Sequence, residues 1–272
     1  MRNCLTYREH RPPQDLSAWV AAYWHIKGTL PPGAGVHHRV LPDGCADLLI
    51  DCQAAHDSTN SQGILVGPMS AAQEFELRGT VDMVGVRFRP GGASSFFGLP
   101  LHHIRDDAVT VSDLPVDCPL RVAQLSEISD SSSRLAKLSA ALRYRLPEIR
   151  GADWVAEAVL AQFASSPVSE PLAIFDLVRS IGLSERAVER RFLASVGMTL
   201  VQFRRLARFR NALRTYAGGC DNWSAIAHAM GYSDQPHLVR EFQAWSGLTP
   251  VAWAASQEGD AGFVQDASVS IA

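Results

Sequence analysis

The sequence has 272 residues, of which 47% are hydrophobic and 19% are charged, and its formal net charge is −3. This composition is ordinary for a soluble globular protein, and the length suggests two domains. No run of about 18 apolar residues occurs, which excludes a membrane-spanning helix. No basic segment followed by an apolar run opens the chain, so we expect a cytoplasmic protein without a membrane partner. The five cysteines are scattered and odd in number, which indicates reduced thiols rather than a disulfide framework.

Residues 1–112 read as a β-rich domain. Short apolar or alternating runs, broken by turn residues, predict strands at 5–9, 20–26, 37–41, 46–51, 63–66, 74–77 and 83–88. The segment Leu41-Pro42-Asp43-Gly44 predicts a hairpin between two of them, and a short helix is expected at 93–97. Seven short strands indicate a small barrel or sandwich whose interior has room for a ligand.

Several polar residues lie within the apolar runs of this domain. We predict that Trp24, Asp47 and Arg87 line a ligand pocket. The alternative interpretation is that an Arg–Asp pair only ties neighbouring strands, with Asp43 shaping the turn and Cys45 filling the core. Two adjacent histidines, His37 and His38, point to opposite faces of a strand and cannot both ligate one ion, so we expect no metal there. We expect no cofactor either.

A competing class is an enzyme that uses Cys45 as a nucleophile. Asp43, Asp47 and His38 lie near it in the expected domain and could supply a base. No catalytic motif supports this arrangement, and scattered Cys and His residues make such constellations easy to assemble on paper. We therefore expect that the protein is not an enzyme.

Residues 113–166 are expected to form a helical connector, with helices at 115–128, 132–146 and 153–163 and a linker near 165–171. The second helix carries leucines at three- and four-residue spacing: Leu135, Leu138, Leu142 and Leu146. This stripe is either buried against the β domain or paired with the same stripe of a second subunit.

Residues 167–256 contain the same supersecondary unit twice. In the first copy, Leu177-Val178 precedes Gly182-Leu183-Ser184, then Arg186, Arg190-x-Phe192 and Gly197-x-Thr199 follow. In the second, Ile226-Ala227 precedes Gly231-Tyr232-x-Asp234, then Arg240-x-Phe242 and Gly247-x-Thr249-Pro250 follow. Each copy predicts a helix, a tight turn at glycine and a second helix, which is a helix-turn-helix arrangement.

The second helix of each copy has a clear start and an outward face. Ser184 and Asp234 are good N-caps, and Pro236 is tolerated in a first turn because its missing N–H has no helical partner there. With the apolar positions turned inward, the residues left for DNA are Arg186, Glu189 and Arg190 in the first copy and Gln235, His237, Val239 and Arg240 in the second. An arginine-rich helix is more often a solvated face, and Arg190 and Arg240 could instead pair with carboxylates inside the domain.

Residues 199–216 separate the copies and contain no internal Gly or Pro. At ~1.5 Å per residue they form a rod of ~27 Å, which can place two helices in successive major grooves ~34 Å apart. Residues 176–216 contain nine arginines and three carboxylates, which gives this segment a net charge of +6. Arg204 and Arg208 on the rod are expected to contact phosphates.

The duplicated motif resembles the DNA-binding domain of the AraC/XylS family of transcription regulators over about the last hundred residues. The resemblance implies two helix-turn-helix units that read adjacent major-groove segments. Leu200 and Pro236 depart from the family's usual residues. The N-terminal half resembles a β-barrel-like sensor module found at the head of some such regulators, through the segments 40–48, 66–68 and 85–93. By analogy that module binds a small molecule.

The sequence thus predicts an α+β protein, with an N-terminal barrel-like or sandwich sensor domain followed by an all-α DNA-binding domain and a 257–272 tail of unassigned role. Its expected partners are double-stranded promoter DNA and a small-molecule effector, with RNA polymerase and a second copy of the chain as further candidates. A DNA-repair-type enzyme and an adaptor that binds DNA without an effector are the alternatives.

Overall fold

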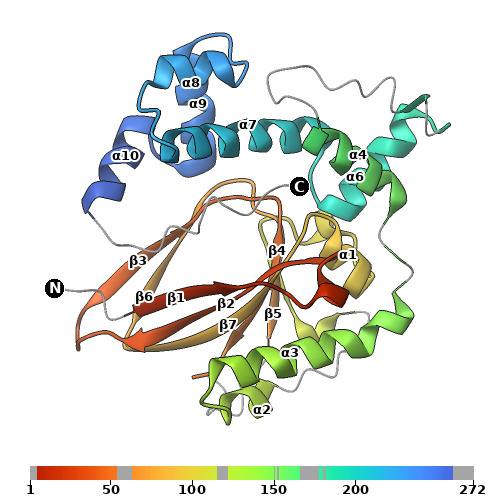
Figure 1. The fold of residues 1–272 in the computed structure, drawn as a ribbon, viewed down its shortest axis with the longest axis vertical. Helices are drawn as coiled ribbons and strands as arrows, with labels where there is room; N and C mark the ends of the chain where they lie inside the picture. The colour runs from red at the N-terminus through yellow and green to blue at the C-terminus, as the bar shows by residue number, and fades with distance from the viewer. Residues whose placement is uncertain are drawn as a thin grey trace.

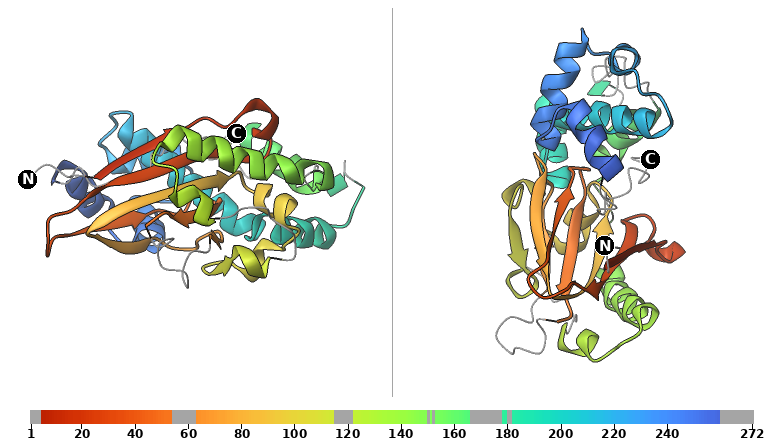
Figure 2. Two further views of the ribbon diagram at one scale, coloured as in Figure 1. Left: turned by 90° about the horizontal axis from the view of Figure 1, so that it is seen from below. Right: turned by 90° about the vertical axis from the view of Figure 1, so that its left-hand side faces the viewer.

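The computed structural model describes residues 5–53, 63–114, 122–149, 151, 153–165, 178–179 and 182–259. A β-sheet domain carries a helical domain at one end, and α3 lies on the far side of the sheets (Figures 1 and 2). The predicted α+β organisation is therefore confirmed. In the part of the chain that the structure describes, no helix has both the length and the apolar character needed to cross a membrane.

Two antiparallel sheets build the N-terminal domain. The larger has the order β1 (Leu5–His10), β2 (Val20–Thr29), β7 (Thr80–Phe88), β4 (Ala46–Asp51), β5 (Ile64–Val66) and β8 (Ala108–Thr110). The smaller pairs β3 (Gly35–Val40) with β6 (Gln73–Arg78). The seven predicted strands are all present. The three-residue β8 was not predicted, because so short a run carries no periodicity.

The predicted hairpin at residues 41–44 is wrong. β3 pairs with β6, whereas β4 pairs with β5 and β7, so the segment between β3 and β4 crosses from one sheet to the other. Turn residues permit both arrangements, and the partner strands decide between them. Asp43 does shape this turn, since its Oδ1 accepts a hydrogen bond of 2.9 Å from the Cys45 N–H.

Alternation along the strands gives the larger sheet two different faces. On β4, Ala46, Leu48 and Ile50 enter the main core, whereas Asp47 and Leu49 face the smaller sheet and line a cavity. The same period of two separates the core residues of β7 from Met83 and Arg87. One face is thus a packed core under the helices, and the other, covered by β3 and β6, is open to a ligand.

Helices α1 (Gly92–Phe97), α2 (Val122–Ser126) and α3 (Ser131–Arg145) belong to the N-terminal domain. Leu135, Leu138 and Leu142 of the leucine stripe are buried in the main core, and Leu146 packs against it. The alternative in which this stripe joins two subunits is therefore wrong. The sheet supplies the apolar partner that an isolated helix would seek in a second chain.

The sequence pattern assigns α4 (Trp154–Ser165) to the connector, but this helix packs in the C-terminal core. Val155 and Val159 are buried there, and Phe163 lies against Phe203 with ring centroids 5.1 Å apart. Asp153 also receives a 2.8 Å ion pair from Arg191. The packing of α4 favours a boundary before 153, and the expected boundary at 167 stays a prediction. The linker expected near 165–171 lies almost wholly outside the described residues.

The remaining helices form the C-terminal domain: α6 (Glu185–Val196), α7 (Leu200–Ala217), α8 (Trp223–Ala229), α9 (Gln235–Ser246) and α10 (Pro250–Gly259). The predicted caps are confirmed, because Ser184 accepts from the Ala187 N–H and Asp234 from the His237 N–H. Pro236 lies in the first turn of α9 as expected. The first helix of the first copy lies mostly outside the described residues.

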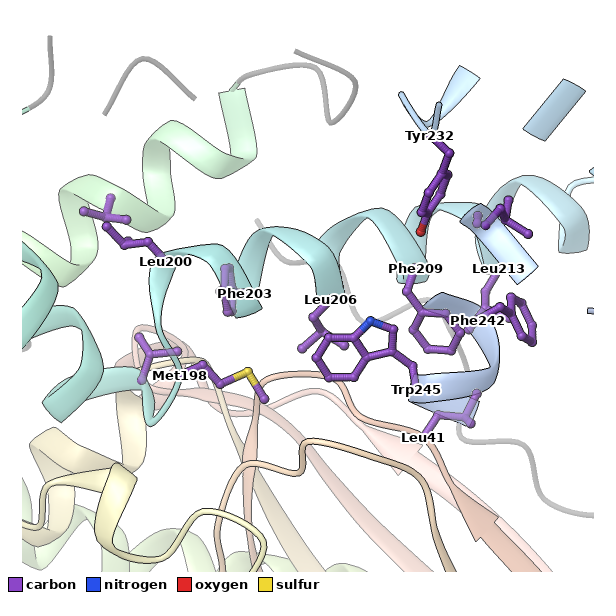
Figure 3. Close-up of a cluster of buried hydrophobic side chains, with 14 of the residues drawn as sticks. Leu41, Met198, Leu200, Phe203, Leu206, Phe209, Leu213, Tyr232, Phe242 and Trp245 are labelled. Carbon is purple, nitrogen blue, oxygen red and sulfur yellow. The ribbon is translucent and has the colours of Figure 1, made fainter. Parts of the chain in front are cut away.

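The apolar side of α7 holds both helix-turn-helix units together. Figure 3 shows Leu200, Phe203, Leu206, Phe209 and Leu213 along one side of this helix, all of them buried. Phe203 packs edge-on against Phe192 of α6 and Phe209 against Phe242 of α9. One helix thus serves as a shared core element for the two units.

The N-terminal domain contacts the C-terminal domain at several points. Leu41 joins the core around Trp245, as Figure 3 shows. The Ala72 N–H donates to the Trp245 carbonyl at 2.8 Å, and the Arg39 guanidinium donates to the Ser246 carbonyl. Both contacts satisfy carbonyls at the C-terminal end of α9. A further contact lies at the first turn of α7, where Arg105 donates to Gln202 at 3.3 Å.

Candidate DNA interface and effector cavity

The predicted DNA-facing residues of α6 lie on its outer surface. Arg186, Glu189 and Arg190 are exposed, while Val188 and Phe192 on the opposite side are buried. Neither Arg186 nor Arg190 has an ion-pair partner within the described part of the chain. The internal pairing considered for Arg190 is thus not seen there, and its guanidinium stays on the surface.

Helix α9 presents a similar but less charged surface. Gln235 and Arg240 are exposed, whereas His237 and Val239 are half-buried. The His237 Nδ1 lies 3.1 Å from the Ser233 hydroxyl, and its Nε2 lies 3.7 Å from Glu241 Oε1. His237 is therefore partly engaged within its own unit, while Gln235 and Arg240 project into solvent.

The linker arginines divide into two kinds. Arg204 is half-buried, and the pKa of its guanidinium is lowered by burial and by the neighbouring charge of Arg208. Arg208 lies deeper. Its Nη2 is 3.1 Å from Glu241 Oε1, and its guanidinium stacks over the Tyr232 ring at 4.8 Å from the ring centre. Arg208 therefore links α7 to the second unit, and its predicted phosphate contact stays a prediction.

Glu241 is a structural residue that sequence reasoning missed. Its side chain is only 5% exposed, and it contacts Arg205 at 2.7 Å, Arg208 at 3.1 Å and His237 at 3.7 Å. We call these four residues the Glu241 cluster. Its sequence signal is a carboxylate between Arg240 and Phe242 on the inward side of the helix, where an unpaired charge would be costly.

A cavity of about 310 Å³ lies between the two sheets of the N-terminal domain. We call it the N-terminal cavity. Its lining is aromatic and aliphatic for the most part, with polar groups gathered at few points: Tyr7, Trp24, Ile26, His38, Val40, Cys45, Asp47, Leu49, Ile64, Val66, Gly67, Met69, Gln73, Phe75, Glu76, Leu77, Met83 and Arg87. This volume and lining suit a small organic ligand. The structure thus brings all three predicted effector residues to one cavity.

Trp24 reaches across the sheet because its neighbour is glycine. Trp24 on β2 faces Gly85 on β7, and a Cβ at position 85 would lie 2.2 Å from the indole ring. The ring occupies that space, and its Nε1–H donates to Asp47 Oδ1 at 2.7 Å. A larger residue at position 85 would displace the indole and the hydrogen bond that orients Asp47.

Arg87 lies behind Asp47 and is surrounded by carboxylates. Its Nη1 is 3.0 Å from Glu9, and its Nε is 3.4 Å from both Asp43 and Asp47. We call these four residues the Arg87 cluster. Burial raises the pKa of Asp47, an effect that the charge of Arg87 opposes. The strand tie weighed in the sequence is real, since Asp47 and Arg87 are directly paired across β4 and β7.

Asp43 connects the Arg87 cluster to the linker helix. Its Oδ2 lies 3.4 Å from Arg87 Nε and 3.9 Å from Arg210 Nη1 on α7. All three side chains are buried. The chain approaches closely here, because a Cβ at Gly44, whose φ is +78°, would lie 2.9 Å from the Phe203 ring of α7. A buried path of charged groups thus runs from the cavity wall to α7.

The cavity gives no support to the nucleophile interpretation of Cys45. Burial and the charge of Asp43 raise the pKa of its thiol well above the ordinary value. A protonated thiol is a weak nucleophile, so Cys45 acts here as a small wall residue. Among the residues that the structure describes, no group of three His, Cys, Asp or Glu side chains is placed to hold a metal ion.

Comparison with known families agrees with the two-domain architecture. Residues 177–256 match a family described as a helix-turn-helix domain. The C-terminal domain is of the AraC type. The chain is accordingly a DNA-binding transcription regulator of this type. Residues 8–110 match a domain of unknown function, DUF6597, which covers the sheets and the N-terminal cavity.

No curated protein matches the chain. Among solved structures, similarity is found to ToxT from Vibrio cholerae O395, with 15% identity, a TM-score of 0.42, and coverage of 94% of this chain and 99% of that one. Unsaturated fatty acid bound wild-type ToxT from Vibrio cholerae strain SCE256 gives 12% identity, a TM-score of 0.42, and coverage of 98% and 100%. These values are too low for a site or a ligand to be transferred from ToxT.

Proposed function

We propose that this AraC-type regulator changes its affinity for promoter DNA when a small molecule fills the N-terminal cavity. The observation that carries the proposal is the position of Asp43, which contacts Arg87 in the cavity wall and Arg210 on the linker helix. A ligand that moves the Arg87 cluster therefore changes a buried ionic contact of α7. Because α7 holds both units, a small displacement of it alters their spacing on DNA.

On the DNA side, we propose that Arg186 and Gln235 contact bases while Arg204 contacts phosphate. The first two begin the exposed faces of α6 and α9, and N-terminal residues of such helices approach base edges in the major groove. Arg186→Ala or Gln235→Ala should reduce affinity for the cognate duplex by ~1–3 kcal/mol and relax preference at one or two base pairs. Arg204→Ala should weaken all duplexes alike and reduce the salt slope of log K by about one.

The measurement is binding of each variant to a duplex selected from a random library and to a scrambled duplex, over a salt series. Equal weakening of both duplexes by Arg186→Ala would show that Arg186 only positions the protein. This assay does not address three other predictions, which are contact with RNA polymerase, self-association and a cytoplasmic location.

The effector role can be tested before the ligand is known, by filling the N-terminal cavity with a side chain. Leu49→Trp places an indole into the cavity from β4. We expect it to change the dissociation constant for the selected duplex by about fivefold, the scale of an ordinary coupling free energy. Thr29→Trp adds the same bulk at the exposed end of β2 and is the control. Unchanged DNA affinity in a folded Leu49→Trp protein would favour a regulator that needs no effector.

A further inference from the structure

The charged groups in the wall of the N-terminal cavity differ in number between the two signs and in their exposure to the cavity. Asp47, Glu76 and Arg87 line it, so carboxylates outnumber the guanidinium. The Arg87 side chain is only 3% exposed and lies against Glu9, Asp43 and Asp47. The Asp47 side chain is 18% exposed. The accessible charge at this end of the cavity is therefore the Asp47 carboxylate.

Aromatic rings stand beside that carboxylate. The Trp24 indole donates to Asp47, and the Tyr7 ring lies 6.4 Å from the indole, with an angle of 32° between their planes. The Tyr7 hydroxyl donates to Glu9, which holds its ring in place. Aromatic faces carry negative potential and attract organic cations, most strongly where water is excluded. The rings and the carboxylate thus favour the same sign of ligand charge.

An anionic ligand would find this end of the cavity unfavourable. To reach Arg87 it would have to approach Asp47 and compete with three carboxylates that already contact the guanidinium. Two carboxylates that share one buried site repel each other, so one of them would have to take up a proton. A cation meets no such penalty, because Asp47 supplies a counter-charge at the point of contact.

We propose that the effector is an apolar molecule, of a size that fits about 310 Å³, that carries one protonated amine. The amine binds the Asp47 carboxylate beside Trp24 and Tyr7, and the apolar body extends between the sheets toward Leu49 and Leu77. This assignment of ligand class rests on the proposed effector function of the same cavity. The proposed effector is therefore an arylalkylamine rather than a fatty acid or a sugar.

The test uses three probes that differ only in their polar end group: tryptamine, tryptophol and indole-propionate. Titration calorimetry on the full, unaltered chain should show tryptamine binding at least about tenfold more tightly than either of the others. Asp47→Asn keeps the shape and the acceptor for Trp24 but removes the charge. It should weaken tryptamine about tenfold and leave tryptophol unchanged.

Asp51→Asn is the matched control, because it removes a carboxylate from the same strand at a position outside the cavity lining. Equal or tighter binding of indole-propionate, no binding of any probe at millimolar concentration, or full tryptamine affinity in Asp47→Asn would each overturn the amine assignment. Tight tryptamine binding with an unchanged DNA dissociation constant would instead overturn the effector function while the ligand class stood.

Discussion

The two charged clusters contain the same groups in different settings. In the Glu241 cluster, a carboxylate on α9 is closed off by Arg205, Arg208 and His237 and is only 5% exposed. In the Arg87 cluster, the carboxylate of Asp47 has one side against Arg87 and another open to the N-terminal cavity. A cluster that is closed on all sides can only hold helices together. One with an open side can also receive a ligand.

Because the Glu241 cluster is closed to solvent, removing its carboxylate should cause a large loss of stability. Glu241→Ala leaves the guanidinium groups of Arg205 and Arg208 on α7 without their shared counter-charge on α9. We expect the free energy of unfolding of the C-terminal domain to fall by about 2–3 kcal/mol, below the full value for a buried pair because Arg205 is 45% exposed. Urea titration followed by tryptophan fluorescence measures this loss. A change under about 0.5 kcal/mol would show that the cluster is not a tie.

In the Arg87 cluster, removing the charge of Asp47 should raise the stability of the protein rather than lower it. Asp47 has a pKa raised from its ordinary 3.8 by burial. The folded protein therefore binds a proton at Asp47 more tightly than the unfolded chain does, and the resulting stabilisation is present below pH 3.8 and is lost as the pH rises through the raised value. Asp47→Asn does not titrate. Its stability relative to the unaltered protein should thus rise over this window.

Unfolding curves of both proteins at several pH values between acid and neutral test this expectation. A constant difference between Asp47→Asn and the unaltered protein across the window would mean that folding leaves the pKa of Asp47 unchanged, which would contradict this expectation.

The smallest effect is expected at the rim of the closed cluster. Arg205 contacts Glu241 at 2.7 Å, but its side chain is 45% exposed, so water can replace most of the interaction. Arg205→Ala should lower the free energy of unfolding by about 0.5 kcal/mol. Arg208→Ala should have a larger effect, because it also removes the stacking on Tyr232. If Arg205→Ala and Arg208→Ala lowered the free energy of unfolding equally, burial would not determine the relative strength of these two contacts.

The sequence predicted the local elements well because their signals are local. Period-two alternation located seven strands, and cap residues located the starts of α6 and α9. The pairing of Asp47 with Arg87 was foreseen as one of two interpretations. These features depend on residues within one element or on adjacent strands with clear patterns.

What was missed depends on partners far apart in the chain. Glu241 contacts Arg205 and Arg208, which lie 36 and 33 residues before it. The local sequence around Asp43 indicates only a hairpin turn, because the contact of Asp43 with Arg210 exists only once the two domains meet. Similarly, α4 reads as connector until Val155 and Val159 are seen in the C-terminal core. Packing between distant elements decides each case, and no single-sequence pattern records it.

The central claim is that the N-terminal cavity and the DNA-binding domain are coupled through Asp43. A double-mutant cycle tests it without knowledge of the effector, with DNA dissociation constants for the unaltered protein, Leu49→Trp, Asp43→Asn and the double variant. Asparagine keeps the acceptor for the Cys45 N–H but removes the charge between Arg87 and Arg210. We predict that Leu49→Trp changes DNA affinity about fivefold with Asp43 present and hardly at all in the Asp43→Asn background. The same change in both backgrounds would contradict this coupling.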